Sequence, residues 1–348
     1  MDSSTPLRTE DVGSPLMSSP PPHPTPAMAP IRIATLVEPD GMPQDTVYLV
    51  TGANRGNSAF LFFYLLFSVA AETHSRPCGV VMIRTQPCWP SAARQIEKAA
   101  FHVLGLNETH AKSTCLGIGL ALVAALLTRP STTVVATVRD PASQAAALAA
   151  LPSARGSRLL VIALSFPHVP ENLEPILSPH GITHIDVVIS NAAVQSSFEP
   201  ILSADPKDLL LDYEINAVGQ LRLFQAAWPL LSKFTRKKFV LLTSSVGSIT
   251  VLDYEVFPGI SYGPSKAGAN WIAKRIAVEF KSQGLLVGIL HPGWIKTDMS
   301  AALAQAAGFP ESTVMPEECA AKLLQRIDEL TPETSGRFLS ADGKDVPW

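Results

Sequence analysis

The sequence predicts an α/β fold in which helices cover both faces of one doubly wound, seven-stranded parallel sheet. Three observations lead to this prediction. Short apolar runs alternate with helical patterns along most of the 348 residues. The runs are nearly continuous in Val, Ile and Leu, as in parallel strands that are buried on both faces. A glycine-rich turn also lies between the first strand and the first helix, as doubly wound sheets require.

The elements follow in order along the chain. The expected strands are the apolar runs at 47–50, 132–138, 158–164, 185–190, 239–243, 286–291 and 337–340. The expected helices lie between them, at 120–127, 141–150, 205–231, 261–282 and 316–330. With 47% hydrophobic and 16% charged residues, the chain has enough apolar surface for a buried core. We therefore expect a single domain over residues 46–348.

Composition also narrows the class of function. The formal net charge of −3 provides no broad cationic surface, so binding to nucleic acid or to acidic membranes is not suggested. The longest apolar run, at 59–71, is shorter than the roughly 20 residues that span a bilayer. The His and Cys residues lack the short spacings of zinc sites, so no metal site is predicted. A cytoplasmic protein that binds a small molecule is expected.

Two segments do not fit the α/β pattern. Residues 1–45 are rich in Ser and Pro and are expected to form a disordered tail. Residues 57–117 form an irregular insertion that interrupts the glycine-rich turn. Their removal would restore an uninterrupted strand, turn and helix, so our hypothesis is that this segment is translated intron. Removing residues 1–41 as well would leave about 250 residues, a normal length for one domain.

The interrupted turn itself indicates a dinucleotide site. Gly52, then Gly56 or Gly117, and Gly119 provide three features in this order. These are a tight turn, a close approach of the backbone to a pyrophosphate, and close packing of the helix that follows. The position of these glycines between a strand and a helix makes the prediction much stronger than three isolated glycines would.

The end of the second strand favours NADP(H) as the cofactor. An arginine at this position, here Arg139, accommodates the 2′-phosphate of NADP, and Arg55 in the glycine-rich turn adds a second cation. Asp140 could instead bind the ribose of NAD. However, Asp followed by Pro141 is also typical of a helix N-cap, and we favour that interpretation.

Tyr262 and Lys266 are the candidate reaction centre. Residues four apart on a helix share one face, so the Lys266 ammonium should lie beside the Tyr262 phenol. A nearby positive charge lowers the pKa of a tyrosine from about 10 toward the range useful for proton transfer. Tyr262 could then act as a general acid toward a carbonyl. Ser244 and Ser245, at the end of the preceding strand, both qualify to bind the carbonyl oxygen.

Two asparagines are candidates for a role in the site. Asn191 follows the fourth strand and could bond across strands, although a plain turn explains it equally well. Asn216 lies in the middle of a predicted helix, where Asn is unfavourable. Its position suggests a role beyond helix formation.

Together these residues resemble the short-chain dehydrogenase/reductase family. The matching motifs are Thr51–Gly56 with Ile118 and Gly119, Asn191–Ala193, Asn216, Ser244, Tyr262 with Lys266, and Pro292–Thr297. The sequence is most similar to the fungal branch that contains norsolorinic acid ketoreductases, which act in secondary metabolism on polyketide-type or other carbonyls. The resemblance implies a Rossmann-like domain with strand order 3-2-1-4-5-6-7, NADP(H) as cofactor, and a homodimer or homotetramer.

The resemblance also implies roles for individual residues. Tyr262 would donate the proton, Lys266 would bind the nicotinamide ribose and lower the tyrosine pKa, and Asn216 would hold a relay water. Ser244 would polarise the carbonyl, with Ser245 as the second choice. The implied cofactor-binding residues are Gly52, Asn54, Arg55, Gly56, Ile118, Arg139, Asn191, Tyr262, Lys266, Pro292, Ile295 and Thr297. Ser165 stands where the family usually has an adenine-binding Asp, and is expected to substitute weakly for it.

We therefore expect NADPH-dependent reduction of a ketone or aldehyde. The alternative is a catalytically silent nucleotide-binding or interaction protein, because the insertion interrupts the pyrophosphate loop. An apolar substrate pocket is expected from five large side chains, some of which could equally be core residues. They are Phe198, Tyr254, Phe257, Trp294 and Met299.

Overall fold

The structure is a computed structural model that describes residues 34–36, 46–52, 117–166, 168–255 and 257–348. Most of the predicted tail and all of the predicted insertion except Gly117 lie outside these ranges. No helix within the described ranges is both long enough and apolar enough to cross a membrane.

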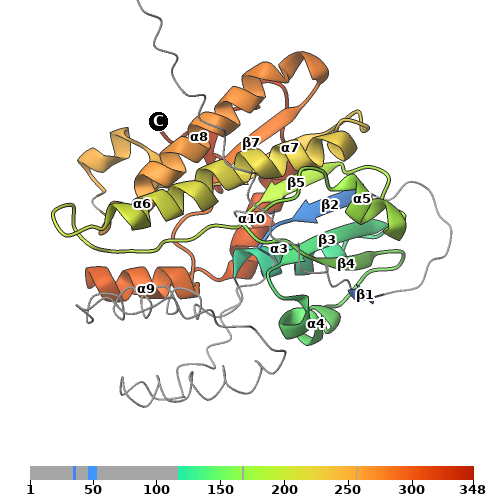
Figure 1. The fold of residues 1–348 in the computed structure, drawn as a ribbon, viewed down its shortest axis with the longest axis horizontal. Helices are drawn as coiled ribbons and strands as arrows, with labels where there is room; N and C mark the ends of the chain where they lie inside the picture. Colours follow the sequence, from blue (N-terminus) through green and yellow to red (C-terminus); the bar gives the residue numbers. More distant parts are fainter. Residues whose placement is uncertain (1–33, 37–45, 53–116, 167, 256) are drawn as a thin grey trace, which may run out of the picture. The chain divides into compact units, whose positions relative to one another are not determined.

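Seven parallel strands form the sheet that the sequence predicts (Figure 1). They are β2 (Thr46–Val50), β3 (Thr132–Val138), β4 (Arg158–Ala163), β5 (Val187–Ser190), β6 (Lys238–Leu242), β7 (Leu286–His291) and β8 (Phe338–Ser340). Their order across the sheet is β4-β3-β2-β5-β6-β7-β8. Counted from β2, this is the predicted order 3-2-1-4-5-6-7.

An eighth strand, β1 (Ala34–Leu36), corrects one expectation. It lies in the segment for which the sequence predicted disorder, and it pairs antiparallel with β4, with Ala34 opposite Val161 and Leu36 opposite Leu159. The physical reason is that β4 forms the edge of the parallel sheet. An edge strand presents backbone N–H and C=O groups with which another segment can pair.

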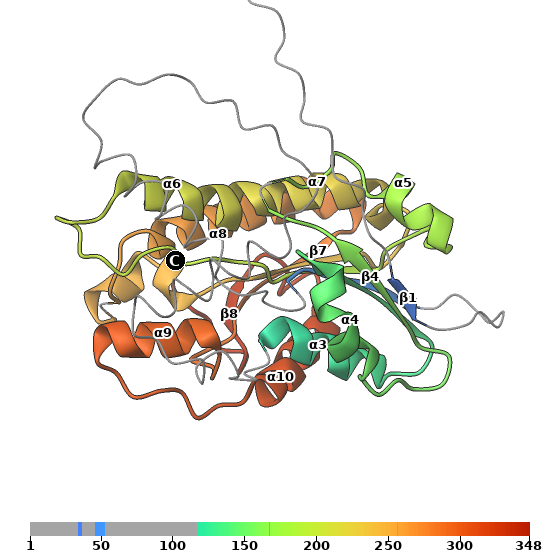
Figure 2. The ribbon, with the colours of Figure 1, turned by 60° about the horizontal axis from the view of Figure 1, so that its bottom comes forward.

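Helices cover both faces of the sheet (Figure 2). Helices α6 (Pro206–Tyr213), α7 (Gly219–Leu231) and α8 (Tyr262–Glu279) lie on one face, and α3 (Ile118–Leu127), α4 (Pro141–Ala149) and α10 (Pro316–Asp328) on the other. Two further α-helices of the described residues are α5 (Glu174–Leu177) and α9 (Asp298–Ala307). Side chains alternate between the faces of a strand. Accordingly, Leu49 of β2 belongs to the core that contains Phe224 of α7, and Val50 to the core that contains Leu122 of α3.

The helix predicted at 205–231 is interrupted. Helix α6 passes into a π-helical segment, Glu214–Val218, before α7 begins at Gly219. Asn216 lies in this segment and is fully buried. A π turn is rare and is frequently found at functional sites, so the unfavourable Asn in the predicted helix marks a real irregularity.

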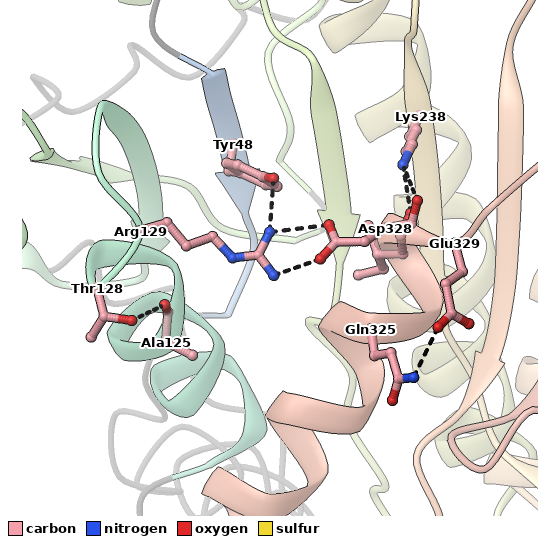
Figure 3. Close-up of polar contacts among 9 residues, drawn as sticks. Tyr48, Ala125, Thr128, Arg129, Lys238, Gln325, Asp328 and Glu329 are labelled. Carbon is pink, nitrogen blue, oxygen red and sulfur yellow. Dashed lines mark hydrogen bonds and ion pairs between the residues drawn. The ribbon is translucent and has the colours of Figure 1, made fainter.

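An ion pair joins Arg129, which lies just after the C-terminal end of α3, to Asp328, the last residue of α10 (Figure 3). The guanidinium of Arg129 donates to both carboxylate oxygens of Asp328, at 3.0 and 2.8 Å, and to the Tyr48 hydroxyl at 3.3 Å. The Lys238 ammonium donates to the Ile327 carbonyl at 2.6 Å, at the end of α10 where helix carbonyls lack intrahelical partners. These contacts hold the two helices against β2 and β6.

Candidate active site

A cleft of about 1370 Å³ lies at the carboxyl ends of the parallel strands, where doubly wound sheets bind their ligands. Most of the predicted site residues line it: Gly52, Ile118, Arg139, Asn191, Ser244, Tyr262, Lys266, Pro292, Ile295 and Thr297. The predicted pocket residues Phe198, Tyr254, Phe257, Trp294 and Met299 line it as well. Asn54, Arg55 and Gly56 lie outside the described residues.

The two halves of the glycine-rich turn meet in space. A Cβ atom on Gly119 would lie 2.2 Å from the Gly52 carbonyl oxygen and 2.7 Å from Nδ2 of Asn191. Gly52 has φ +62°, where a side chain is strained, and its own Cβ would lie 3.0 Å from Cα of Ala192. Both positions therefore require glycine, and the start of α3 touches the end of β2 directly.

The first turn of α3 opens into the cleft. Gly117, Ile118 and Gly119 line it, and the N-cap residue Gly117 has no side chain with which to cap the helix. The first amides of a helix have no intrahelical acceptor, and the helix dipole is positive at this end. This arrangement suits the phosphate groups of a dinucleotide.

Asn191 connects β2 and β5 at the floor of the cleft. Its Nδ2 donates to the carbonyl oxygens of Thr51, at 3.0 Å, and Gly52, at 3.1 Å. Its backbone N–H donates to Oγ1 of Thr51 at 3.0 Å. The structure thus has the cross-strand bonds that were one of the two interpretations of this residue.

The predictions for the adenine side of the cleft have mixed outcomes. Arg139 lines the cleft. The carboxylate of Asp140 accepts a bond of 3.0 Å from the Ala142 N–H at the start of α4, which confirms the capping interpretation. Leu164 and Phe166 line the cleft, but Ser165 between them does not; its hydroxyl donates to the Phe166 carbonyl at 3.4 Å. The expectation that Ser165 substitutes weakly for an adenine-binding Asp stays a prediction.

Asn216 lies directly behind the cleft wall. Its Oδ1 accepts from the Val194 N–H at 2.8 Å, and its Nδ2 donates to the Val194 carbonyl at 2.7 Å and to Oγ of Ser265 at 2.9 Å. Val194 lines the cleft and Ser265 belongs to α8. The side chain of Asn216 therefore holds the segment after β5 against α8.

Tyr262 and Lys266 lie side by side, as their spacing predicts. Tyr262 is the first residue of α8, and the ammonium of Lys266 lies 5.5 Å from the centroid of its ring. That ammonium also donates to the Leu242 carbonyl at the end of β6, at 3.0 Å. Burial lowers the pKa of Lys266 to about 8, against an opposing effect of the negative charge of Asp212.

The two serines after β6 have different partners. The hydroxyl of Ser244 accepts from the Val246 N–H at 3.3 Å, which leaves its own proton for another acceptor. The hydroxyl of Ser245 donates to the carboxylate of Glu255 at 3.2 Å, and its N–H donates to Nδ1 of His291 at 3.1 Å. Ser244 is thus better placed to donate to a carbonyl oxygen in the cleft.

Gly247 allows the turn that carries Ser244 and Ser245 to lie close to α8. A Cβ atom at this position would lie 2.8 Å from Cβ of Lys266 and 2.9 Å from the backbone N of Ala267. Any side chain would therefore push the helix that carries Tyr262 away from Ser244. Neither this contact nor the bonds of Glu255 and His291 were predicted from the sequence.

Comparison with known proteins identifies the family. The family described as Enoyl-(Acyl carrier protein) reductase matches residues 114–326. Short chain dehydrogenase gsfK of Penicillium aethiopicum is 38% identical over 243 residues, which cover 67% of this chain and 95% of gsfK. The norsolorinic acid ketoreductase of Aspergillus parasiticus is 35% identical over 239 residues, which cover 67% of this chain and 88% of that protein.

Solved structures show the same fold. The NADPH-bound carbonyl reductase from chicken fatty liver superposes with a TM-score of 0.60 at 22% identity, covering 88% of this chain and 96% of that one. A carbonyl reductase from Pseudomonas aeruginosa PAO1 in complex with NADP gives 0.52 at 25% identity, covering 67% of this chain and 95% of that one. The chain belongs to the short-chain dehydrogenase/reductase family. Within it, the chain is similar to fungal norsolorinic acid ketoreductases, and it is an oxidoreductase acting on carbonyl groups.

Proposed function

We propose that this chain uses NADPH to reduce a ketone or aldehyde of polyketide type to an alcohol. The observation that carries the proposal is the placement of Tyr262, with Lys266 beside it, in the same cleft as Ser244 and the first turn of α3. The similarity to proteins named norsolorinic acid ketoreductases supports this class of substrate.

The described residues fit NADPH. The close approach of Gly119 to Gly52 leaves backbone, rather than side chains, at the place where a pyrophosphate would lie. Arg139, in the lining after β3, would bind the 2′-phosphate, and Pro292, Ile295 and Thr297 would bind the nicotinamide carboxamide end. Asn54, Arg55 and Gly56 belong to the same proposed set. When bound, NADPH supplies the hydride that the carbonyl carbon accepts.

The chain's own residues supply the proton. The Tyr262 hydroxyl donates its proton to the carbonyl oxygen while Ser244 donates a hydrogen bond to the same oxygen. The Lys266 ammonium then stabilises the tyrosinate that is left. Asn216 would hold a water through which the tyrosine regains a proton from solvent. The products are an alcohol and NADP⁺.

Carbonyl-dependent oxidation of NADPH tests this proposal. The purified full chain is mixed with NADPH and a panel of aromatic ketones, quinones and aldehydes, and absorbance of the reduced nicotinamide is followed. We expect at least one of these carbonyls to be reduced to its alcohol, identified by mass spectrometry. Binding of NADPH without turnover of any carbonyl would favour the alternative of a catalytically silent nucleotide-binding protein.

The domain division is also part of the proposal. About a third of this chain has no counterpart in gsfK, although 95% of gsfK is matched, and the family match begins at residue 114, close to the end of the predicted insertion. These facts support the hypothesis that residues 57–117 are translated intron. Sequencing of the mature transcripts tests it, and retention of the segment in most messages would contradict it.

The cellular location and the assembly remain predictions. We expect a cytoplasmic protein that forms a homodimer or homotetramer. Cell fractionation and analytical ultracentrifugation measure these two properties directly.

A further inference from the structure

Residues 341–348, which we call the C-terminal segment, turn back along β8 and form part of the cleft lining. Leu339 and Asp345 form an antiparallel bridge, and the Val346 N–H donates to the Phe338 carbonyl at 2.9 Å. The residues of the segment that line the cleft are Ala341, Asp342, Asp345, Val346 and Pro347. The proposed reaction assigns them no role.

Trp348 of this segment binds the loop at residues 250–259. The N–H and the hydroxyl of Thr250 both donate to the backbone oxygen of Trp348, at 3.1 and 2.7 Å. The Trp348 ring packs against the ring of Phe338 in β8, with 5.4 Å between the centroids. The Lys274 ammonium of α8 lies 5.9 Å from the centroid of the Trp348 ring. The C-terminal segment is thus fixed to β8 and α8, and its backbone holds the start of the loop.

The same loop is anchored at its other end. Gly259 has φ +85°, and a Cβ atom there would lie 2.5 Å from the Ser197 carbonyl oxygen and 2.9 Å from Cα of Phe198. Between the two anchors the loop contributes two of the predicted pocket residues to the cleft lining, Tyr254 and Phe257. The C-terminal segment, the loop and the segment after β5 therefore form one continuous wall of the cleft.

This wall suits an extended apolar ligand. Val251 of the loop and Val346 and Pro347 of the C-terminal segment line the cleft, together with the aromatic side chains of the predicted pocket. Apolar surface that a ligand buries against such a wall stabilises its binding in proportion to the area. A fused-ring aromatic ketone gains from this contact, whereas an aldehyde small enough to reach only Ser244 and Tyr262 does not.

We propose that the C-terminal segment, bound to Thr250 through Trp348, closes the substrate end of the cleft and makes the site selective for fused-ring aromatic ketones over small aldehydes. The selectivity rests on the proposed function. The attachment of the loop does not, because it is a property of the folded chain without substrate or cofactor.

Four variants of the full chain test this proposal. Deletion of residues 346–348 removes two wall residues and the partner of Thr250. Thr250→Val keeps the shape of the side chain and removes only the hydroxyl bond. Trp348→Ala keeps the backbone oxygen and removes the ring that fixes it. Thr128→Val is the matched control, because this exposed hydroxyl also donates to a backbone oxygen at 2.7 Å, that of Ala125, and does not line the cleft.

Hydrogen exchange, followed by mass spectrometry, tests the attachment without substrate or cofactor. We expect the amides of residues 250–255 to exchange at least about tenfold faster after the deletion, and about two- to tenfold faster in Thr250→Val, which loses one hydrogen bond. Thr128→Val should leave them unchanged. Unchanged amides of β6 in every variant would show that the sheet is intact. Unchanged exchange at 250–255 in a folded deletion variant overturns the proposal.

Binding and reduction of two carbonyl compounds test the selectivity. Calorimetry on the chain saturated with NADP⁺ measures the dissociation constants of a fused-ring aromatic ketone and a small aliphatic aldehyde, and steady-state kinetics with NADPH measure KM and kcat. We expect the deletion to raise the dissociation constant and KM of the ketone about tenfold, and to change its kcat and all values for the aldehyde by less than about twofold. Equal losses for the two compounds, or no loss for either, would overturn the selectivity.

These measurements distinguish a failure of this proposal from a failure of the proposed function. If the unmodified chain neither binds nor reduces any carbonyl compound, the proposed function fails, and hydrogen exchange still decides whether the C-terminal segment holds the loop. If the deletion variant does not fold, Thr250→Val and Trp348→Ala decide. Unchanged exchange at 250–255 and unchanged binding of the ketone in both variants would then overturn the proposal.

Discussion

Gly119 at the start of α3 lies directly against the carbonyl of Gly52 at the end of β2, so close that a Cβ atom would stand 2.2 Å from the oxygen. The predicted insertion lies between these two glycines in the sequence, and nearly all of it is outside the described residues. Their contact nevertheless forms the turn that the proposed cofactor site needs. The fold therefore brings the interrupted motif together, and the contact can be tested by substitution.

Substitution of Gly119 by Ala should damage this contact. Because the added methyl group meets backbone rather than a flexible side chain, we expect a loss of about 2 kcal/mol in the free energy of unfolding, or more. We also expect at least a tenfold weaker binding of NADPH. Urea denaturation and fluorescence titration measure the two effects. For the free energy of unfolding, Gly117→Ala is the control, because Gly117 has φ −70° and its Cβ would meet nothing within 4 Å.

The two serines after β6 should respond differently to Ala. Ser244→Ala removes the hydroxyl that we propose as the donor to the carbonyl oxygen, and we expect kcat to fall about 100-fold. Ser245→Ala removes a bond to Glu255 instead, and a fall of less than about tenfold is expected. Steady-state kinetics on one ketone compare the two variants. The reverse ranking would make Ser245 the catalytic serine.

Arg139 should determine the preference for NADPH over NADH. Loss of a charge-assisted bond between arginine and phosphate costs about 1.5–3 kcal/mol, which corresponds to a roughly 10- to 100-fold change in affinity. We therefore expect Arg139→Ala to raise the dissociation constant of NADPH by this factor and to leave that of NADH nearly unchanged. An equal effect on both cofactors would place Arg139 away from the 2′-phosphate.

The stability of the fold should decrease in mild acid because of His291. Burial lowers the pKa of His291 from 6.5 to about 4, and its neutral ring accepts the Ser245 N–H. Between these values the unfolded chain binds the proton more strongly, so the folded state loses stability as pH falls from 6.5 to 4. The contribution of this residue is about 3 kcal/mol. Denaturation across this range should show a flatter pH dependence for His291→Asn, and identical slopes in the two proteins would rule out this contribution.

The sheet could be predicted from the sequence because each parallel strand is a continuous apolar run between two helical patterns. Strand β1 could not, because its three residues are held by pairing with the edge of β4, and this depends on the tertiary fold. The π segment at Glu214–Val218 was visible only as an unfavourable Asn in a predicted helix. Asn216 of this segment bonds to Ser265 of α8, a contact that no local sequence pattern contains.

The candidate site also has some features that the sequence could predict and others that it could not. The spacing of Tyr262 and Lys266 was enough to predict that their side chains are neighbours, because residues four apart on a helix share one face. The bonds of Asp212 to Ser196 were not predictable, since these two residues meet only after α6 packs against the segment that follows β5. Ser165 was assigned by family position alone, and in the structure its neighbours Leu164 and Phe166 line the cleft.

The most direct test of the account is the dependence of NADPH oxidation on Tyr262. Turnover of a ketone is measured for the full chain and for a chain that lacks residues 57–117, each with and without Tyr262→Phe. We expect turnover at least in the shortened chain, and a loss of about 1000-fold in Tyr262→Phe with NADPH binding retained. Absence of turnover in both chains, or turnover that survives Tyr262→Phe, would contradict the assignment of this cleft as a carbonyl reductase site.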